Sequence, residues 1–133
     1  MRERPEAHEL LAIARATLKS DILAALPAEQ KYAALMIANA MSIAERQYVV
    51  GDKNKQLELE ALCDVLDVDP VSYRAQLDES KDPLVCASRE VAVLIRNGYF
   101  DNPEKQQKLK QLLWSSVTAR VGESNPKALN ADW

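Results

Sequence analysis

The apolar positions of the chain concentrate in one stretch, Lys31 to Val50, where they fall on almost every side of a helix. Asn39 interrupts them at the centre of the stretch. A helix that is apolar all round is normally buried by its neighbours. We therefore predict a central helix here, with Pro27 in its first turn, Gly51 just past its end, and a buried, hydrogen-bonded Asn39.

Amphipathic stripes with the period of an α-helix lie on both sides of this segment. They predict helices over residues 5–26, 53–66, 83–97 and 103–121, and a shorter helix over 71–77. Pro27 separates the first of these from the central helix, so the two should pair as an αα-hairpin. Asp69, Asp82 and Asn102 each precede a proline and are expected as N-caps, and Gly98 is expected to end the helix over 83–97.

The fold class that these elements define is all-α, an antiparallel helical bundle of about five helices around a buried central helix. The length of 133 residues suits one domain. We expect a single helical domain over 1–133, with 123–133 as a non-helical tail. Asn125 and Pro126 should turn this tail back so that Leu129 packs on the helices, and Trp133 is its other large apolar residue.

The charge balance argues against a general nucleic-acid surface, because the net charge is −3 and the sequence pI is about 5.2. No apolar run is long enough to span a bilayer, and no apolar segment follows the charged N-terminus as it would in a secretory signal. We expect a cytoplasmic protein that binds neither nucleic acid nor a membrane. Cys63 and Cys86 are then expected to be free thiols.

Candidate catalytic and metal-binding groups are few. His8 is the single histidine and lies close to the N-terminus, which disfavours it as an ordered base. Asp67, Asp69 and Asp78 are spaced loosely like the acids of an EF-hand loop. However, Ser72 replaces the required glycine, and the twelfth position is aspartate rather than glutamate. We expect no metal, no cofactor and no catalytic residue, which favours a non-catalytic function.

One polar cluster interrupts the central helix, where Asn39, Ser42 and Arg46 lie nearly in line. Two interpretations remain open. The cluster is either a structural network, in which Arg46 pairs with a carboxylate, or the lining of a small interhelical pocket that holds an anion. Arg89 and Arg96, seven residues apart on their helix, are candidates to join such a ligand-binding pocket.

A candidate interface is indicated by apolar residues that lie beside the main core-facing stripes. Trp114 falls well off the centre of its stripe, and Val85 and Val93 fall beside the apolar face of theirs. Exposed apolar residues and tryptophan are typical of interfaces, so these residues predict docking of a partner or a symmetric dimer. The alternative is that the connection at Tyr99 and Phe100 covers them.

Three stretches together resemble a known family: YAALMIANAMSIAERQ, LVCASREVAVLIRNGYFD and VTARVGESNPKAL. These stretches occur in a fixed order, with Asn39 first, then Arg96 with Gly98, then the Asn125 to Lys127 ending. In this order the chain resembles a bacterial family of small uncharacterised helical proteins. It is a domain-of-unknown-function family whose genes often lie near those for acyl-CoA dehydrogenases and aminoglycoside-phosphotransferase-like proteins. The resemblance covers nearly the whole chain and is weakest between Leu57 and Asp82.

The resemblance implies a cytoplasmic accessory protein near acyl-CoA or phosphotransfer metabolism, with no catalytic residue to transfer. The first function class is therefore a non-catalytic module that binds a protein partner, such as the neighbouring phosphotransferase or dehydrogenase, or a second copy of itself. The alternative class is a small-molecule binder or enzyme that uses the polar pocket around Asn39 and Arg46. We prefer the first class because good general acids, bases and nucleophiles are missing.

Overall fold

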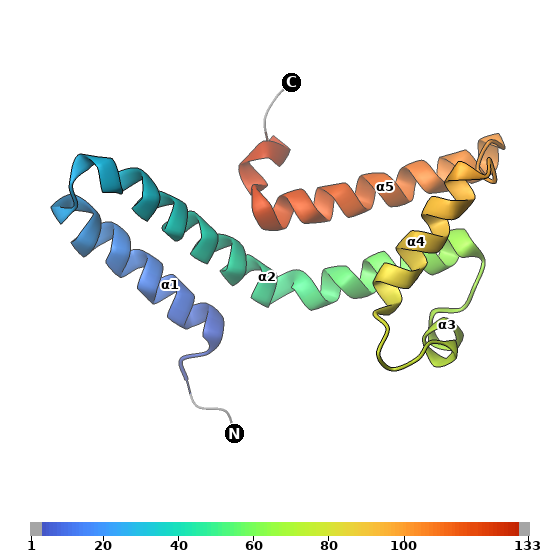
Figure 1. Ribbon diagram of the computed structural model, residues 1–133, viewed down its shortest axis with the longest axis horizontal. Coiled ribbons are helices and arrows are strands. Elements are labelled where there is room, and N and C mark those ends of the chain that lie inside the picture. The colour runs from blue at the N-terminus through green and yellow to red at the C-terminus, as the bar shows by residue number, and fades with distance from the viewer. Residues whose placement is uncertain (1–3, 131–133) are drawn as a thin grey trace. The chain divides into compact units, whose positions relative to one another are not determined.

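The structure, a computed structural model, describes residues 4–130, and within that range it is all-α, with five α-helices and no strand (Figure 1). The α-helices are α1 (Ala7–Thr17), α2 (Ala28–Leu66), α3 (Pro70–Gln76), α4 (Pro83–Arg96) and α5 (Pro103–Ser124). A π-helical turn, η1 (Leu18–Ile22), and two 3-10 turns, η2 (Leu23–Ala25) and η3 (Pro126–Asn130), complete the described elements. The predicted all-α class is confirmed.

The chain forms two compact units. The first unit consists of residues 1–52 and 122–133, and the second of residues 53–121. Helices α2 and α5 each contribute residues to both units.

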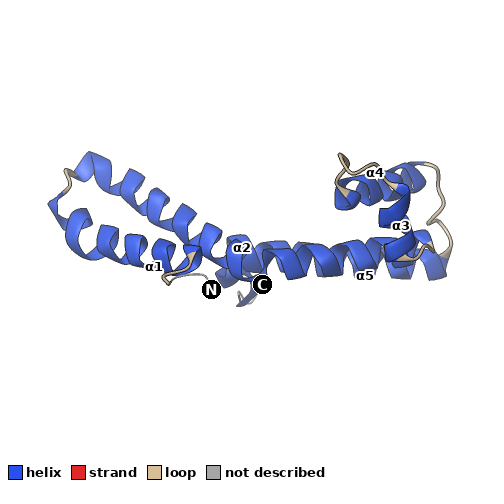
Figure 2. Cartoon of the chain, turned by 90° about the horizontal axis from the view of Figure 1, so that it is seen from below, coloured by secondary structure: helices blue, strands red, loops and turns tan. Residues whose placement is uncertain are grey.

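In the first unit, α1 and the first half of α2 run antiparallel, as Figures 1 and 2 both show. Two contacts fix the pairing. Arg15 Nη2 lies 3.0 Å from Glu45 Oε2, and the His8 ring stacks on Tyr48 with 5.4 Å between ring centroids. His8 is earlier in α1 than Arg15, but its partner Tyr48 is later in α2 than Glu45, so the two helices run in opposite directions. The αα-hairpin predicted around Pro27 is therefore confirmed.

Helix α2 does not stop at Gly51, contrary to the prediction. It runs unbroken from Ala28 to Leu66 and includes both the expected central helix and the helix expected over 53–66. A glycine inside a helix costs only about 1 kcal/mol relative to alanine. The helix-forming residues on both sides outweigh this cost when no proline or left-handed residue intervenes, so the glycine is not enough to end the helix.

The burial predicted for residues 31–50 is also wrong. Ala34 and Ala38 are buried there, but Tyr32, Met36 and Ile37 are exposed, and so is Asn39. In the first unit this half of α2 pairs with α1, and one neighbouring helix covers only one side of a helix. The apolar character of the remaining faces is therefore not satisfied by burial within this unit.

The main hydrophobic core lies in the second unit and uses the second half of α2. It joins Leu59, Leu62, Cys63 and Val65 of α2 with Tyr73, Ala87, Val91, Phe100, Leu109 and Leu112. The core residue Tyr73 of α3 also donates a 2.8 Å hydrogen bond from its hydroxyl to Glu90 Oε1 of α4. Phe100 packs in the core, whereas its neighbour Tyr99 is exposed and packs edge-on against it.

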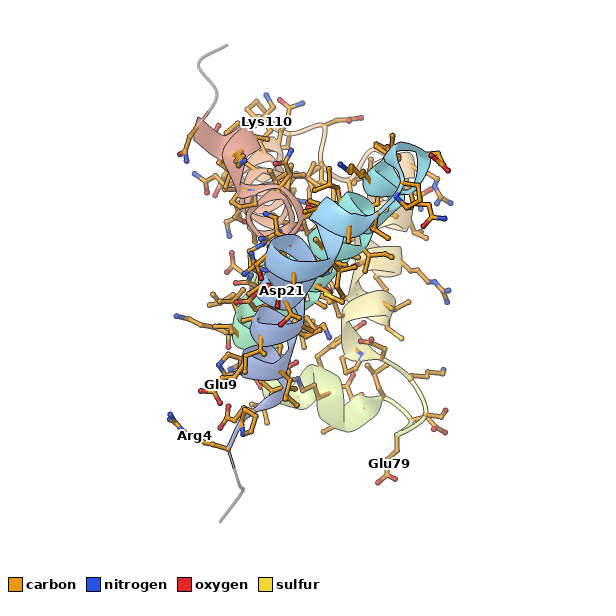
Figure 3. The ribbon with its side chains drawn as sticks, turned by 90° about the vertical axis from the view of Figure 1, so that its left-hand side faces the viewer. Arg4, Glu9, Asp21, Glu79 and Lys110 are labelled. Atoms are coloured by element: carbon orange, nitrogen blue, oxygen red, sulfur yellow. The ribbon has the colours of Figure 1, made fainter. Side chains whose placement is uncertain are left out.

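Helices α3, α4 and α5 begin as the sequence predicts. Oxygens of Asp69, Asp82 and Asn102 accept hydrogen bonds of 2.8 to 2.9 Å from main-chain amides in the following turn. The bond from Ser72 lowers the pKa of the Asp69 carboxyl. Gly98 follows α4 with a φ of +75°, the left-handed conformation expected of it. The loop between α3 and α4 carries Glu79 at its outer edge (Figure 3).

The C-terminal segment is more helical than expected. Helix α5 continues through Gly122 to Ser124, and η3 follows it, so the prediction of a non-helical tail is wrong over 123–130. The amide of Ala128 donates a 3.0 Å bond to the Asn125 carbonyl, which closes the turn. Leu129 lies beside Gly122, although about half of its surface stays exposed. The expectation for Trp133 lies outside the described residues.

Candidate functional site

A hollow of about 400 Å³ lies in the first unit, and the three polar residues that the sequence singled out on α2 line it. Asn39, Ser42 and Arg46 form its α2 side. The rest of the lining comes from α1, η1, the apolar side of α2 and the C-terminal turn: Arg15, Lys19, Leu35, Ala38, Ser124, Asn125, Pro126 and Lys127. We call this feature the basic hollow, because its charged lining residues are all arginine or lysine.

Arg46 is held in a fixed position at the edge of the basic hollow. Its Nη1 lies 2.7 Å from Ser42 Oγ, its Nε donates to the Glu123 carbonyl at 2.6 Å, and its Nη2 donates to the Ser124 carbonyl at 3.3 Å. The last carbonyls of a helix have no partner within the helix and attract cations. Arg46 therefore caps the C-terminal end of α5, instead of pairing with a carboxylate as the network interpretation proposed.

The remaining cations of the basic hollow differ in their partners. Arg15 pairs with Glu45, and its Nε is buried without a hydrogen-bond partner among the described residues. Lys19 and Lys127 are exposed and form no ion pair within residues 4–130. Asn39 is exposed as well, so its predicted buried hydrogen bond is not present, but its side chain remains part of the lining.

The structure does not bring all predicted ligand-binding residues together. Arg89 and Arg96 are exposed on α4 in the second unit and do not line the basic hollow. Sequence reasoning missed Arg15, Lys19 and Lys127. The four-residue spacing of Arg15 and Lys19 places them on one helix face, but nothing in the sequence indicated that residue 127 returns to that face.

A second concave feature, in the second unit, is an apolar groove between α4 and α5 with α2 beneath it, of about 310 Å³. Leu62, Val91 and Leu112 lie buried at its base, and further lining comes from residues of all three helices. The exposed apolar residues along it are Ile95 (44% exposed), Leu113 (49%) and Val117 (56%). We call this feature the apolar groove.

One end of the apolar groove is polar. Glu58 of α2 accepts hydrogen bonds from the Ser116 hydroxyl and from Arg120 Nη2, the second at 2.9 Å. These bonds join α2 to α5 and hold the two helices that form this end of the groove. The groove therefore combines apolar walls with one charged, hydrogen-bonded end.

The residues predicted for an interface lie on exposed surface but do not line the apolar groove. Trp114 is 77% exposed, Val85 43% and Val93 48%. Tyr99 and Phe100 do not cover Trp114, because an indole that is 77% exposed has no such cover. Ile95, Leu113 and Val117 follow the same helical period as the buried positions, so periodicity alone does not distinguish these groove residues from core residues.

The two thiols and the histidine lie in packed parts of the two units. Cys63 is fully buried in the core, and burial raises the pKa of its thiol. Cys86 is half-buried and also free. His8 packs on Tyr48 within the hairpin of α1 and α2. Over residues 4–130 no group of three or more His, Cys, Asp or Glu side chains is placed to hold a metal ion.

No helix in the described part of the chain combines the length and the apolar character that crossing a membrane requires.

The fold and the two concave features define a small all-α protein. A family model described as a domain of unknown function, DUF6285, matches residues 24–128. The chain therefore belongs to this family, which agrees with the resemblance to a domain-of-unknown-function family found in the sequence. No curated protein and no solved structure matches the chain.

Proposed function

We propose that this protein is a non-catalytic interaction module that binds an amphipathic helix of a partner protein in the apolar groove. The observation that supports this function most directly is that Ile95, Leu113 and Val117 remain roughly half exposed side by side over a buried base. Exposed apolar patches of this kind usually mark interfaces. An apolar groove between two helices is the shape in which the apolar face of a third helix is commonly bound.

The energetic gain from filling the groove is large enough to matter. Fully burying a leucine, isoleucine or valine side chain contributes about 1.5–3 kcal/mol. These three residues are already half-buried, so a docked helix would gain about 1 kcal/mol from each. The sum corresponds to about a hundredfold in affinity, which is appreciable for a regulatory or accessory contact.

The proposed partners derive from the gene context that the family resemblance suggests. A phosphotransferase-like protein or an acyl-CoA dehydrogenase encoded nearby is the first candidate, which would make the chain a cytoplasmic accessory protein of acyl-CoA or phosphotransfer metabolism. A second copy of the chain is the other candidate. Exposure of Trp114, Val85 and Val93 supports a second apolar contact surface in either case.

The test uses one charge placed inside the groove and one placed outside it on the same helix. Val117→Glu adds a carboxylate among the apolar walls, and Gln111→Glu adds the same charge on α5 outside the groove. Light scattering measures self-association, and co-purification measures binding to tagged versions of the two neighbouring proteins. We expect at least one association that Val117→Glu weakens more than tenfold and that Gln111→Glu preserves.

Two results would contradict the proposal. The first is a chain that neither self-associates at tens of micromolar nor binds either neighbour. The second is an association that survives Val117→Glu, since this would locate the contact elsewhere. Circular dichroism melts of both variants ensure that loss of binding does not reflect loss of folding.

A further inference from the structure

We propose that the basic hollow binds the phosphate group of a small phosphorylated molecule. This inference is independent of the interaction function, because the basic hollow and the apolar groove lie in different units and share no residue. It rests on charge, on the fixed geometry of Arg46, and on the size of the hollow.

The charge of the lining is the first argument. Four cationic side chains, Arg15, Lys19, Arg46 and Lys127, line the hollow, and no carboxylate is part of its described lining. Glu45 compensates Arg15. Arg46 bonds to a hydroxyl and two carbonyls, which carry no full charge. The charges of Lys19, Arg46 and Lys127 therefore remain uncompensated within the lining. They repel one another, and a bound dianion would be attracted to all three.

The geometry of Arg46 is the second argument. A guanidinium has five N–H donors, and the three bonds to Ser42, Glu123 and Ser124 each use one nitrogen. One N–H on Nη1 and one on Nη2 are therefore left for a ligand. Because the side chain is already held by its three bonds, binding costs it little further conformational entropy. A guanidinium that is already fixed and keeps two free N–H donors suits the oxygens of a phosphate group.

Lys19 and Lys127 supply the second part of the recognition. They come from η1 and η3, two segments more than one hundred residues apart in the sequence, and both line the same hollow. Exposed lysines are mobile point charges that can close on a bound phosphate. The Asn39 and Asn125 side chains add amide donors to the lining.

The size of the hollow sets the class of molecule. A volume of about 400 Å³ falls in the lower part of the range of small-molecule sites and exceeds what inorganic phosphate alone would fill. The remaining space is lined by Leu35, Ala38 and Pro126, which are apolar. A phosphate monoester with a small organic group matches both parts of the lining.

The test is titration calorimetry of the full chain with phenyl phosphate at constant ionic strength, repeated with succinate as a dianion that lacks phosphate. We expect phenyl phosphate to bind with a dissociation constant below about 1 mM and succinate to bind at least tenfold more weakly. Lys19→Gln and Lys127→Gln should each weaken the binding of phenyl phosphate about three- to tenfold, the loss of one exposed charge contact. The control is Lys31→Gln, an exposed lysine of the same unit outside the hollow, which should bind as the unaltered chain does.

Three results would overturn the proposal. The first is no binding at 10 mM phenyl phosphate, roughly the weakest affinity worth assigning to a site. The second is that Lys31→Gln weakens binding as much as Lys19→Gln and Lys127→Gln do, and the third is that succinate binds as tightly as phenyl phosphate.

A separate experiment distinguishes a soluble ligand from a lipid headgroup. Flotation with phosphatidic acid vesicles should not recover the chain, and flotation that Lys19→Gln abolishes would assign the hollow to a membrane lipid instead. Melting curves of each variant exclude unfolding as the cause.

Discussion

Arg46 Nε donates a 2.6 Å hydrogen bond to the main-chain carbonyl of Glu123, which lies 77 residues further along the chain. Together with the bond from Nη2 to the Ser124 carbonyl, this contact attaches the end of α5 to the first half of α2. The carbonyls at a helix end otherwise depend on water. The same side chain thus stabilises the fold of the first unit and shapes the edge of the basic hollow.

Replacing Arg46 with methionine should lower the free energy of unfolding by about 1–2 kcal/mol, because the carbonyls of Glu123 and Ser124 at the end of α5 lose a charged donor. Arg46→Lys should recover only part of this, since one ammonium cannot reproduce the three separate bonds. Urea denaturation measures the change. Arg89→Met, at an exposed arginine of α4, is the matched control and should change the stability little.

Gly51→Ala should stabilise the protein by about 0.5–1 kcal/mol, because the glycine lies inside α2 and pays the entropy cost of a helical glycine. The added Cβ would come no closer than 3.9 Å to the Cβ of Gln47, which is ordinary contact. Thermal unfolding measures the change. A lower melting temperature would indicate that the helix ends at residue 51, as the sequence had suggested.

Gly98→Ala provides the opposite case. The residue has a φ of +75°, and an added Cβ would lie 2.8 Å from Asp101 Oδ2. An alanine in this conformation costs about 1 kcal/mol or more, and the Asp101 side chain must also move. We expect a lower melting temperature for this variant, so that the two glycine substitutions shift stability in opposite directions in the same assay.

Tyr73→Phe should destabilise the second unit by about 1 kcal/mol at neutral pH through loss of the hydrogen bond to Glu90. Burial and the Glu90 carboxylate raise the pKa of Tyr73 above its ordinary value. Above about pH 10 the unfolded chain releases this proton while the folded chain retains it, so the contribution of Tyr73 to stability is complete below that pH and is lost as the pH rises.

The measurement is urea denaturation of both proteins between about pH 7 and pH 11, which spans the ordinary tyrosine pKa. The difference in stability between the unaltered chain and Tyr73→Phe should shrink above about pH 10. A difference that stays constant or grows would argue against a buried, proton-donating Tyr73. Tyr32→Phe, at a side chain that is 72% exposed, is the control for loss of a hydroxyl as such.

The two cysteines should react with a thiol reagent at very different rates. Cys86 is half-buried, whereas Cys63 is fully buried and has a raised thiol pKa, so little thiolate is available to react. We expect one reactive thiol in the native protein and two after unfolding, measured by absorbance. The variant Cys86→Ser should show none in the native state, and rapid reaction of that variant would contradict the burial of Cys63.

Local signals in the sequence predicted the second unit well. Asp69, Asp82 and Asn102 cap their helices, and Gly98 takes the left-handed conformation, because each of these roles depends on a few neighbouring residues. Gly51 shows the limit of such reasoning. A glycine only permits a helix end, and whether the helix stops there depends on the summed preferences of many residues.

The sites were less predictable because they depend on which surfaces meet. Asn39 was expected to be buried on the assumption that an all-round apolar helix has neighbours on every side. Among the described residues of the first unit, only α1 and the end of α5 with η3 lie against this half of α2. Ser42 and Arg46 were correctly placed together by their four-residue spacing. Lys127 could not be linked to them, since its position depends on the course of the whole chain.

The π-helical turn η1 has a consequence for how the length of this chain can change. The amide of Leu23 bonds to the carbonyl of Leu18, five residues earlier, so this turn holds one residue more than an α-helical turn. A π-helical turn completes about the same rotation as an α-helical turn with one residue more, so deleting Ser20 would permit a continuous α-helix and keep the residues on both sides in phase. Arg15 would still face Glu45. Natural variants of this segment should therefore tolerate the loss of one residue at this turn.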